Sequence, residues 1–233
     1  MRKYSAFDIL GPVMIGPSSS HTAGAARLGK IAGIIAGEGI VKVKFMLHGS
    51  FAKTYKGHGT DRALTAGILG MNPCDERLRD SLNIAKEKGI DVEFEEADLG
   101  DVHPNTVKFI ISKKDGTDVE VRGSSIGGGS IIINEIDGEE IEITGEYPTL
   151  IINHKDMPGV ISKVTELLYW ENINIAFMRV YRSKKGSDAI MVFETDTVVP
   201  EDVVNRITGL SYKIKELGYI KSVKVISPVT EGE

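Results

Sequence analysis

The order of apolar patterns between residues 150 and 226 limits the folds open to this chain more than any other feature. Strand-type and helix-type patterns follow one another as strand, helix, strand, strand, helix, strand. Each helical segment has a single apolar face, formed by Val160, Val164, Leu167 and Leu168 in the first and by Val203, Ile207, Leu210, Ile214 and Leu217 in the second. Two one-sided helices need one sheet face to cover, so we expect a ferredoxin-like βαββαβ sandwich with right-handed crossovers.

The residues before this segment predict a separate domain of mixed type. Helical patterns dominate its first part, and from Val92 onward apolar residues alternate as in an antiparallel sheet. The chain changes character at Tyr147-Pro148, so we place one domain at residues 1–147 and the second at residues 148–233. The expected fold class is therefore α/β (α+β), and the uncovered sheet edge and face of the second domain are expected to serve self-association.

The sequence GPSSSHTAGA at residues 16–25 is the first candidate site. A Gly-Pro loop turns into a helix there, and a helix start offers unpaired N–H groups and the positive end of its dipole to an anion. Ser19 or Ser20 is also suited to capping this helix, which is the simpler interpretation. Ser20 and His21 are not a ready nucleophile and base, because adjacent helical residues do not face each other.

The sequence FAKTYKGHGTD at residues 51–61 is the second candidate site segment. It follows a predicted strand at residues 41–47 and places His58 between two glycines. Thr60 is expected to cap a helix that runs to about Leu69. A third glycine-rich segment, SSIGGGS at residues 124–130, either admits a ligand close to the backbone or serves as a bend.

The composition excludes several classes of function. The net charge of −5 argues against a general nucleic-acid-binding role. No apolar run approaches the roughly 18 residues of a membrane-spanning helix, so we expect a cytoplasmic protein without membrane contact. Cys74 is the single cysteine among 233 residues, and this count excludes an internal disulfide and any metal or iron-sulfur site built from several cysteines of this chain.

Two family resemblances emerge from these segments. Residues 151–180, which contain INHKDMPGV, resemble the start of an ACT domain, the small amino-acid-sensing module, and the resemblance extends to about Ile226. GPSSSHTAGAARLG at 16–29, HGSFAKTYKGHGTDRAL at 48–64 and SIGGGSI at 125–131 resemble the beta chain of the iron-sulfur-dependent L-serine dehydratases. The resemblance covers nearly the whole chain in the expected order.

This resemblance implies a lyase subunit of amino-acid catabolism and gluconeogenesis that converts L-serine to pyruvate and ammonia. The family uses a [4Fe–4S] cluster in place of pyridoxal phosphate, and in its two-chain form an alpha chain carries the cluster cysteines. A Lewis-acidic iron stabilises charge that develops on the departing hydroxyl. The single cysteine agrees with this division, because one thiol cannot hold such a cluster. We expect Cys74 to be a turn or core residue and this chain to hold no metal.

The resemblance also suggests roles for individual residues. The substrate carboxylate is assigned to Ser18, Ser19, Ser20 and Thr22 at the helix start. Either His21 or His58 transfers the proton, and the sequence does not choose between them. Lys53 is a candidate for binding the carboxylate and Asp61 for orienting His58, while a solvated lysine and a helix-start acid are equally consistent with these residue types. His48 and His103 are expected to be structural.

In ACT domains the effector lies at the loop after the first strand and at the start of the second. The matching positions here are His154, Asp156, Gly159 and Asn174. Asp156 stands where serine-binding members commonly have asparagine, and its charge would oppose an amino-acid carboxylate. It is also suited to capping the helix after Met157-Pro158. Amino-acid sensing and a purely structural or dimerising role therefore both stay open.

A different class of function fits the same segments. In that alternative the chain is a non-catalytic regulatory protein, whose first domain binds an anionic metabolite and whose ACT domain binds an amino-acid effector. The resemblance of the first domain to the allosteric substrate-binding domain of some phosphoglycerate dehydrogenases supports this alternative. A cluster-bearing partner chain and serine turnover are the features that distinguish the enzyme subunit from the regulator.

Overall fold

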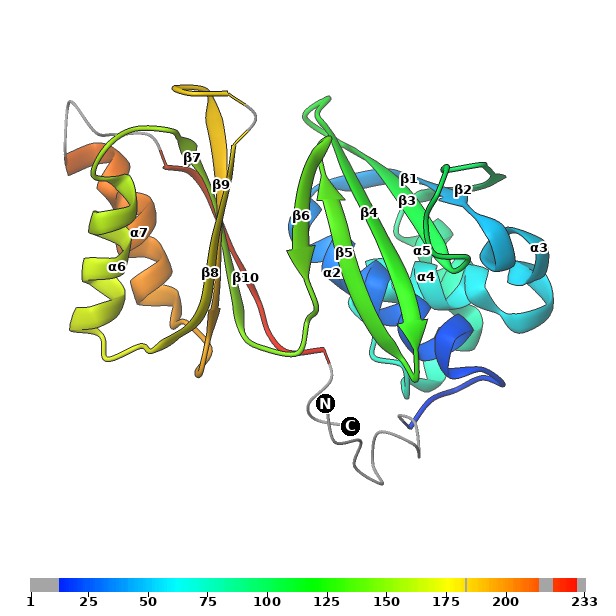
Figure 1. The fold of residues 1–233 in the computed structure, drawn as a ribbon. Helices are drawn as coiled ribbons and strands as arrows, with labels where there is room; N and C mark the ends of the chain where they lie inside the picture. Colours follow the sequence, from blue (N-terminus) through cyan, green and yellow to red (C-terminus); the bar gives the residue numbers. More distant parts are fainter. Residues whose placement is uncertain (1–12, 183, 214–219, 230–233) are drawn as a thin grey trace. The chain divides into compact units, whose positions relative to one another are not determined.

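A computed structural model describes residues 13–182, 184–213 and 220–229. The chain divides into two compact units between Thr144 and Gly145, and each has its own sheet (Figure 1). In the described residues, no helix is both long enough and apolar enough to cross a membrane.

The N-terminal unit is built on a six-stranded sheet with the order β2-β1-β3-β4-β5-β6. The strands are β1 (Ile40–Leu47), β2 (Asp91–Glu96), β3 (Thr106–Lys113), β4 (Asp118–Gly127), β5 (Ser130–Ile136) and β6 (Glu139–Ile143). β2 pairs with β1 in parallel, and the other neighbours are antiparallel. The expectation of a purely antiparallel sheet was wrong for β2, because the helices between β1 and β2 form a crossover that returns the chain in the same direction.

The helical elements of this unit lie together on one face of the sheet (Figure 1). They are the π-helical turn η1 (Ser19–Gly24), α2 (Ala25–Ala36), α3 (Gly49–His58), α4 (Thr60–Ile68), the 3-10 turn η2 (Glu76–Asp80) and α5 (Ser81–Glu87). α2 and α4 pack backbone to backbone: a Cβ added to Gly67 would lie 2.1 Å from the Ala26 carbonyl oxygen. Glycine is required there because any larger residue separates the two helices.

The sheet and the helices share a core that is rich in aromatic residues. Phe45, Phe51 and Phe109 are fully buried, and the rings of Phe45 and Phe109 meet edge to face at 5.5 Å. The alternation of buried and partly exposed residues along β1 and β3 produces this arrangement, since successive side chains of a strand point to opposite faces. The core fixes the ends of β1 and β3, from which the candidate site is built.

The C-terminal unit confirms the predicted βαββαβ order. Its elements are β7 (Thr149–Lys155), α6 (Val160–Trp170), β8 (Ile175–Arg182), β9 (Asp188–Thr195), α7 (Glu201–Lys213) and β10 (Ile220–Ile226). The strand order is β10-β7-β9-β8, and all pairs are antiparallel. The predicted helix faces supply the core through Val160, Val164, Leu168, Val203 and Ile207. Leu217 and Ile214, also assigned to this face, lie outside the described residues.

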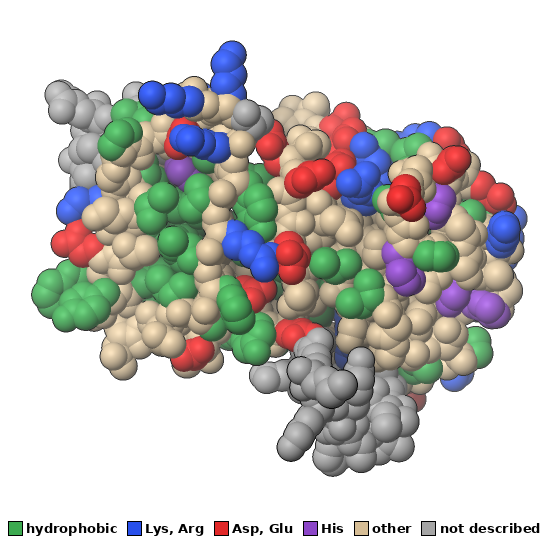
Figure 2. Space-filling view, viewed as in Figure 1, with side chains coloured by type: hydrophobic (Ala, Val, Ile, Leu, Met, Phe, Trp, Pro, Cys, Tyr) green, Lys and Arg blue, Asp and Glu red, His purple; other side chains and the backbone are tan. Residues whose placement is uncertain are grey.

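The edge strand β8 presents apolar side chains to solvent within its own unit. Phe177, Met178 and Val180 have 55%, 45% and 37% of their surface exposed. Figure 2 shows hydrophobic side chains at the surface of the C-terminal unit. An edge strand with this composition is suited to pairing with another chain. Self-association of the ACT domain stays a prediction, and β8 is the strand through which we expect it.

Candidate active site

The first wall of the candidate site is the turn that opens the helix at residues 18–24. Its N-cap is Ser18, not Ser19 or Ser20, and the Ser18 hydroxyl accepts the backbone N–H of His21 at 3.3 Å. The following residues form a π-helical turn before the chain continues as α2. Such turns are rare and occur frequently at functional sites, because the extra residue per turn displaces side chains from the regular helical positions.

The glycines beside this turn are required by close contacts. A Cβ on Gly24 would lie 2.1 Å from the Ser125 hydroxyl oxygen, and a Cβ on Gly16 would lie 2.2 Å from Thr22 Oγ1. β4 therefore packs directly against the turn through Ser125. This contact brings the third glycine-rich segment to the site, although only the turn and the segment around His58 were assigned roles from the sequence.

The second wall comes from the end of β1 and from α3. Gly49 adopts a positive φ of 57°, and a Cβ there would lie 2.7 Å from the Pro104 carbonyl oxygen. α3 starts at this glycine and ends at His58, where Gly59 adopts the left-handed conformation and α4 begins. The prediction that Thr60 caps the next helix was wrong: Gly59 occupies the N-cap position, and its backbone geometry sets the new helix direction.

His21 and His58 meet where the two walls join. Their ring centroids are 4.8 Å apart with an interplanar angle of 79°, and Phe51 packs edge to face on His21 at 5.2 Å. His21 is buried, with 8% of its surface exposed, whereas His58 is exposed. The two candidate segments therefore form one site, in which the imidazole of His21 is buried and the imidazole of His58 lies at the surface.

Both ring nitrogens of His21 face serine hydroxyls. Ser18 Oγ lies 3.3 Å from Nδ1, and Ser50 Oγ lies 3.3 Å from Nε2. Burial lowers the pKa of His21 below 6.5, the positive charge of a protonated His58 lowers it further, and a backbone hydrogen bond at Ser50 opposes both effects. His21 is thus a neutral imidazole near neutral pH.

Three hydroxyl groups around these walls are buried without a hydrogen-bond partner among the described residues. They belong to Thr22, Thr60 and Ser125, which are at most 1% exposed. An unpaired buried hydroxyl costs about 1–3 kcal/mol, so its presence indicates a polar ligand or water as the missing partner. Ser18, Ser19 and Ser20 are partly buried on the same turn.

The family model "Serine dehydratase beta chain" matches residues 5–136, and the ACT domain model matches residues 149–211. The chain belongs to the serine dehydratase beta chain family. A "Probable L-serine dehydratase, beta chain" of Bacillus subtilis is 44% identical over 210 residues, which cover 90% of this chain and 95% of the relative.

Two further relatives show how this beta-chain architecture is distributed. The "L-serine dehydratase, beta chain" of Peptoniphilus asaccharolyticus is 44% identical over 211 residues, with 90% of this chain and 95% of the relative covered. A D-3-phosphoglycerate dehydrogenase of Methanocaldococcus jannaschii is 32% identical over 209 residues, which cover 87% of this chain and 37% of that protein. The same pair of domains thus occurs as a beta chain and as part of a larger dehydrogenase.

Two other residues predicted for the beta-chain site lie outside the histidine pair's contacts. Lys53 is exposed on α3 and has no polar partner in the part of the chain that the structure describes. Asp61 accepts the backbone N–H of Arg62 at 2.9 Å, and burial raises the pKa of its carboxyl group. In the described part of the chain, no hydrogen bond joins Asp61 to His58, so its orienting role stays a prediction.

His48 and His103 each accept a backbone N–H, and the structural roles expected of them and of Cys74 stay predictions. His48 Nδ1 accepts the backbone N–H of Leu99 at 3.1 Å, and His103 Nδ1 accepts that of Asn105 at 3.1 Å. Cys74 is partly buried near a turn. Within residues 13–182, 184–213 and 220–229, no group of three His, Cys, Asp or Glu side chains is arranged to hold a metal ion.

The predicted effector positions of the ACT domain are mostly engaged in local contacts. Asp156 accepts hydrogen bonds from Gly186 N–H at 3.0 Å and from Arg182 at 2.8 Å, which lower the pKa of its carboxyl group. It therefore ties the loop after β7 to the β8–β9 hairpin. The expectation that it caps α6 was wrong, because Gly159, with a φ of 90°, is the N-cap. Asn174 donates to Asp196 at 2.8 Å.

His154 is the effector position with an unused polar atom. It is 2% exposed, its Nδ1 lies 2.6 Å from the Lys155 carbonyl oxygen, and its Nε2 is buried without a partner among the described residues. The pairing of β7 places His154 opposite Ile220, next to residues that the structure does not describe. The effector role of these four positions stays a prediction.

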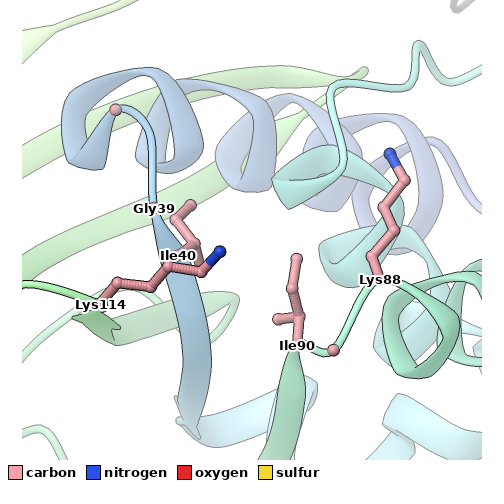
Figure 3. Close-up of a pocket in the computed structure, with 7 residues that line it drawn as sticks. Gly39, Ile40, Lys88, Ile90 and Lys114 are labelled. Atoms are coloured by element: carbon pink, nitrogen blue, oxygen red, sulfur yellow. The ribbon is translucent and has the colours of Figure 1, made fainter.

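A hollow of about 430 Å³ lies at the far end of β1 from the histidine pair (Figure 3). Ile40 and Ile90 form its floor, and Lys88 and Lys114 lie at its rim. The hollow adjoins the residues that follow α2 and α5, and Lys86 in the last turn of α5 offsets the negative end of that helix dipole. It contains none of the predicted site residues.

Proposed function

We propose that this beta chain forms a cytoplasmic L-serine dehydratase with an alpha chain, and that the two-chain enzyme converts L-serine to pyruvate and ammonia. The observation that carries the proposal is the meeting of His21 and His58 beside a turn of unpaired and partly buried hydroxyls. The family resemblance supports the reaction. The hydroxyls of the turn suit the carboxylate of a zwitterionic amino acid, and the histidine pair suits removal of its Cα proton.

The substrate carboxylate is assigned to the turn at residues 18–24. The start of a helix favours an anion through its N–H groups and its dipole. The hydroxyl of Thr22 is buried and unpaired among the described residues, and Ser19 and Ser20 lie on the same turn. Ser18 has a different part, because its hydroxyl contacts both the backbone N–H and Nδ1 of His21.

Proton removal from Cα is assigned to His58 rather than to His21. His58 is exposed, and neither of its ring nitrogens has a hydrogen-bond partner in the described part of the chain. His21 is buried, and both of its nitrogens face serine hydroxyls, so it has no free nitrogen for the substrate. In this proposal His21 supports the ring of His58 and binds no substrate itself.

The elimination balances without an added oxidant or reductant. His58 takes the Cα proton, the Cβ–O bond breaks, and the departing hydroxide receives a proton from the imidazolium of His58 to leave as water, which regenerates the base and leaves aminoacrylate. Aminoacrylate tautomerises to the imine, which takes up water to give pyruvate and ammonia. The groups that stabilise the leaving hydroxyl are assigned to the partner chain.

The iron-sulfur cluster belongs to the same proposal. This chain has one cysteine, and its described residues form no cluster of metal-ligating side chains, so they do not fit a [4Fe–4S] group. We therefore assign all cluster ligands to the alpha chain and assign no step of this mechanism to the cluster. The ACT domain is assigned to self-association through the exposed apolar residues of β8.

The test is anaerobic co-expression of this chain with a cysteine-rich alpha chain, followed by a serine-to-pyruvate assay. The proposal predicts that the complex is active and that this chain alone is inactive. The alternative of a non-catalytic regulator is supported by the likeness to D-3-phosphoglycerate dehydrogenases. A colourless complex that binds serine but does not consume it would favour the regulator.

A further inference from the structure

Among the described residues, the side-chain hydrogen-bond partners of the His21 ring come from two segments, and both are hydroxyls rather than carboxylates. Ser18 precedes the π-helical turn, and Ser50 stands in the first turn of α3. Their hydroxyl oxygens lie 3.3 Å from Nδ1 and 3.3 Å from Nε2. A catalytic histidine is commonly oriented by a carboxylate, which stabilises the protonated ring; a hydroxyl orients the ring without supplying that charge.

The hydrogen bonds of the two serine hydroxyls favour one tautomer of the His21 ring. Ser18 Oγ accepts the backbone N–H of His21, and its one proton can be donated to Nδ1 when that ring nitrogen is unprotonated. A neutral imidazole that accepts at Nδ1 carries its proton on Nε2, which donates to Ser50 Oγ. In this tautomer, the hydroxyl proton of Ser18 and both ring nitrogens of His21 each take part in a hydrogen bond.

The position of Ser50 is determined by neighbouring backbone groups. Its N–H donates to the Pro104 carbonyl at 2.7 Å, and its carbonyl accepts the hydroxyl of Thr54 at 2.8 Å. Gly49 allows the close approach to Pro104. The backbone of Ser50 is thus held in place before any substrate binds, which positions the residue to orient another side chain.

We infer that Ser50 is a positioning residue that, together with Ser18, holds His21 in the neutral tautomer protonated on Nε2 and with its ring against His58. Because these two partners are hydroxyls, they orient the His21 ring without supplying a negative charge that would favour its protonated form. The catalytic consequence rests on the proposed function, whereas the tautomer is a property of this chain alone.

Nitrogen-15 NMR of the labelled full-length chain tests the tautomer without requiring activity. In the wild-type chain we expect a protonated Nε2 and an unprotonated Nδ1 on His21 at neutral pH. Ser50→Ala is expected to lower the ratio of the two tautomers by about fivefold, as loss of one net hydrogen bond allows. Ser50→Thr retains a hydroxyl and is expected to restore the ratio, and Ser112→Ala is the matched control on β3.

A proton on Nδ1 in the wild-type chain would overturn the inference, and so would an unchanged ratio in Ser50→Ala. The wild-type measurement decides the tautomer even if Ser50→Ala fails to fold. In the two-chain complex, Ser50→Ala is expected to lower kcat about tenfold with little change in KM, and Ser50→Thr to recover it. An inactive wild-type complex with the expected tautomer would refute the proposed function and leave the tautomer assignment intact.

Discussion

The rings of His21 and His58 meet edge to face with their centroids 4.8 Å apart, although they belong to separate helical segments. The contact exists because the π-helical turn at residues 19–24 and the carboxyl end of α3 converge. It gives the two histidines unequal surroundings, one buried between serines and one exposed. The two histidines are therefore suited to different roles in this beta chain.

Substitution of either histidine is expected to abolish turnover, with different costs in stability. His58→Ala should leave the free energy of unfolding within about 0.5 kcal/mol of wild type, since surface substitutions usually have small effects. His21→Ala should lower it by about 1–3 kcal/mol, because it removes a buried ring and leaves two hydroxyls without their partner. Urea unfolding and the serine-to-pyruvate assay measure both effects. Full activity in His21→Ala would remove that residue from the mechanism.

The stability of the N-terminal unit should depend on pH through His21. The folded chain lowers the pKa of His21 below 6.5, so the unfolded chain binds more protons as the pH falls below that value. The free energy of unfolding should therefore decrease as the pH falls from about 6.5 towards the lowered pKa of His21. Urea titrations of His21→Gln should show a flatter profile in that range. Equal slopes in wild type and His21→Gln would contradict the burial argument.

Gly24→Ala tests the contact between the turn and β4. Its Cβ would lie 2.1 Å from Ser125 Oγ, and the required shift should cost about 1–3 kcal/mol. Gly57→Ala is the matched control, because nothing lies within 4 Å of its added Cβ and alanine in a helix is favoured by about 0.5–1 kcal/mol. Thermal unfolding of both variants measures the difference. A Gly24→Ala variant as stable as wild type would show that β4 does not hold the turn tightly.

Asp188 should stabilise the ACT domain at neutral pH and lose this effect within a narrow range of acidic pH. It forms ion pairs with Lys155, at 2.9 Å, and with Lys221, and hydrogen bonds from both lower its pKa to about 2. Since the folded-state pKa is depressed from 3.8, the stabilisation is complete above pH 3.8 and is lost as the pH falls through about 2. Asp188→Asn should lower stability at neutral pH and reduce the loss on acidification, whereas Asp118→Asn should do neither. Parallel acid unfolding curves for wild type and Asp188→Asn would refute this.

The sequence predicted the C-terminal unit well because its information is local. Each helix face reads directly from the spacing of residues such as Val160, Val164 and Leu168, and one-sided helices leave a single economical arrangement. The same local logic identified both histidine segments. It did not identify Asp156 as a hairpin contact, because its partner Arg182 is distant in sequence and the capping preference of aspartate was equally consistent with the pattern.

The parts that the sequence did not predict depend on long-range packing. Ser50 joins the site because Pro104 receives its N–H, and Ser125 joins because β4 passes beside Gly24. The parallel pairing of β2 depends on the crossover through α5 rather than on any residue of β2. A signal for Ser50 was present in the run His48-Gly49-Ser50, where a polar residue follows a strand end.

The most direct test of the central claim is a mixing titration of the two-chain enzyme. The alpha chain is assembled anaerobically with wild-type and His58→Gln beta chains in varied ratio, and pyruvate formation from serine is measured. We expect activity to fall in proportion to the fraction of His58→Gln chain, because that chain occupies the partner without providing the base. Activity that stays at the wild-type level in complexes containing only His58→Gln beta chains would contradict the claim that this polypeptide supplies part of the active site.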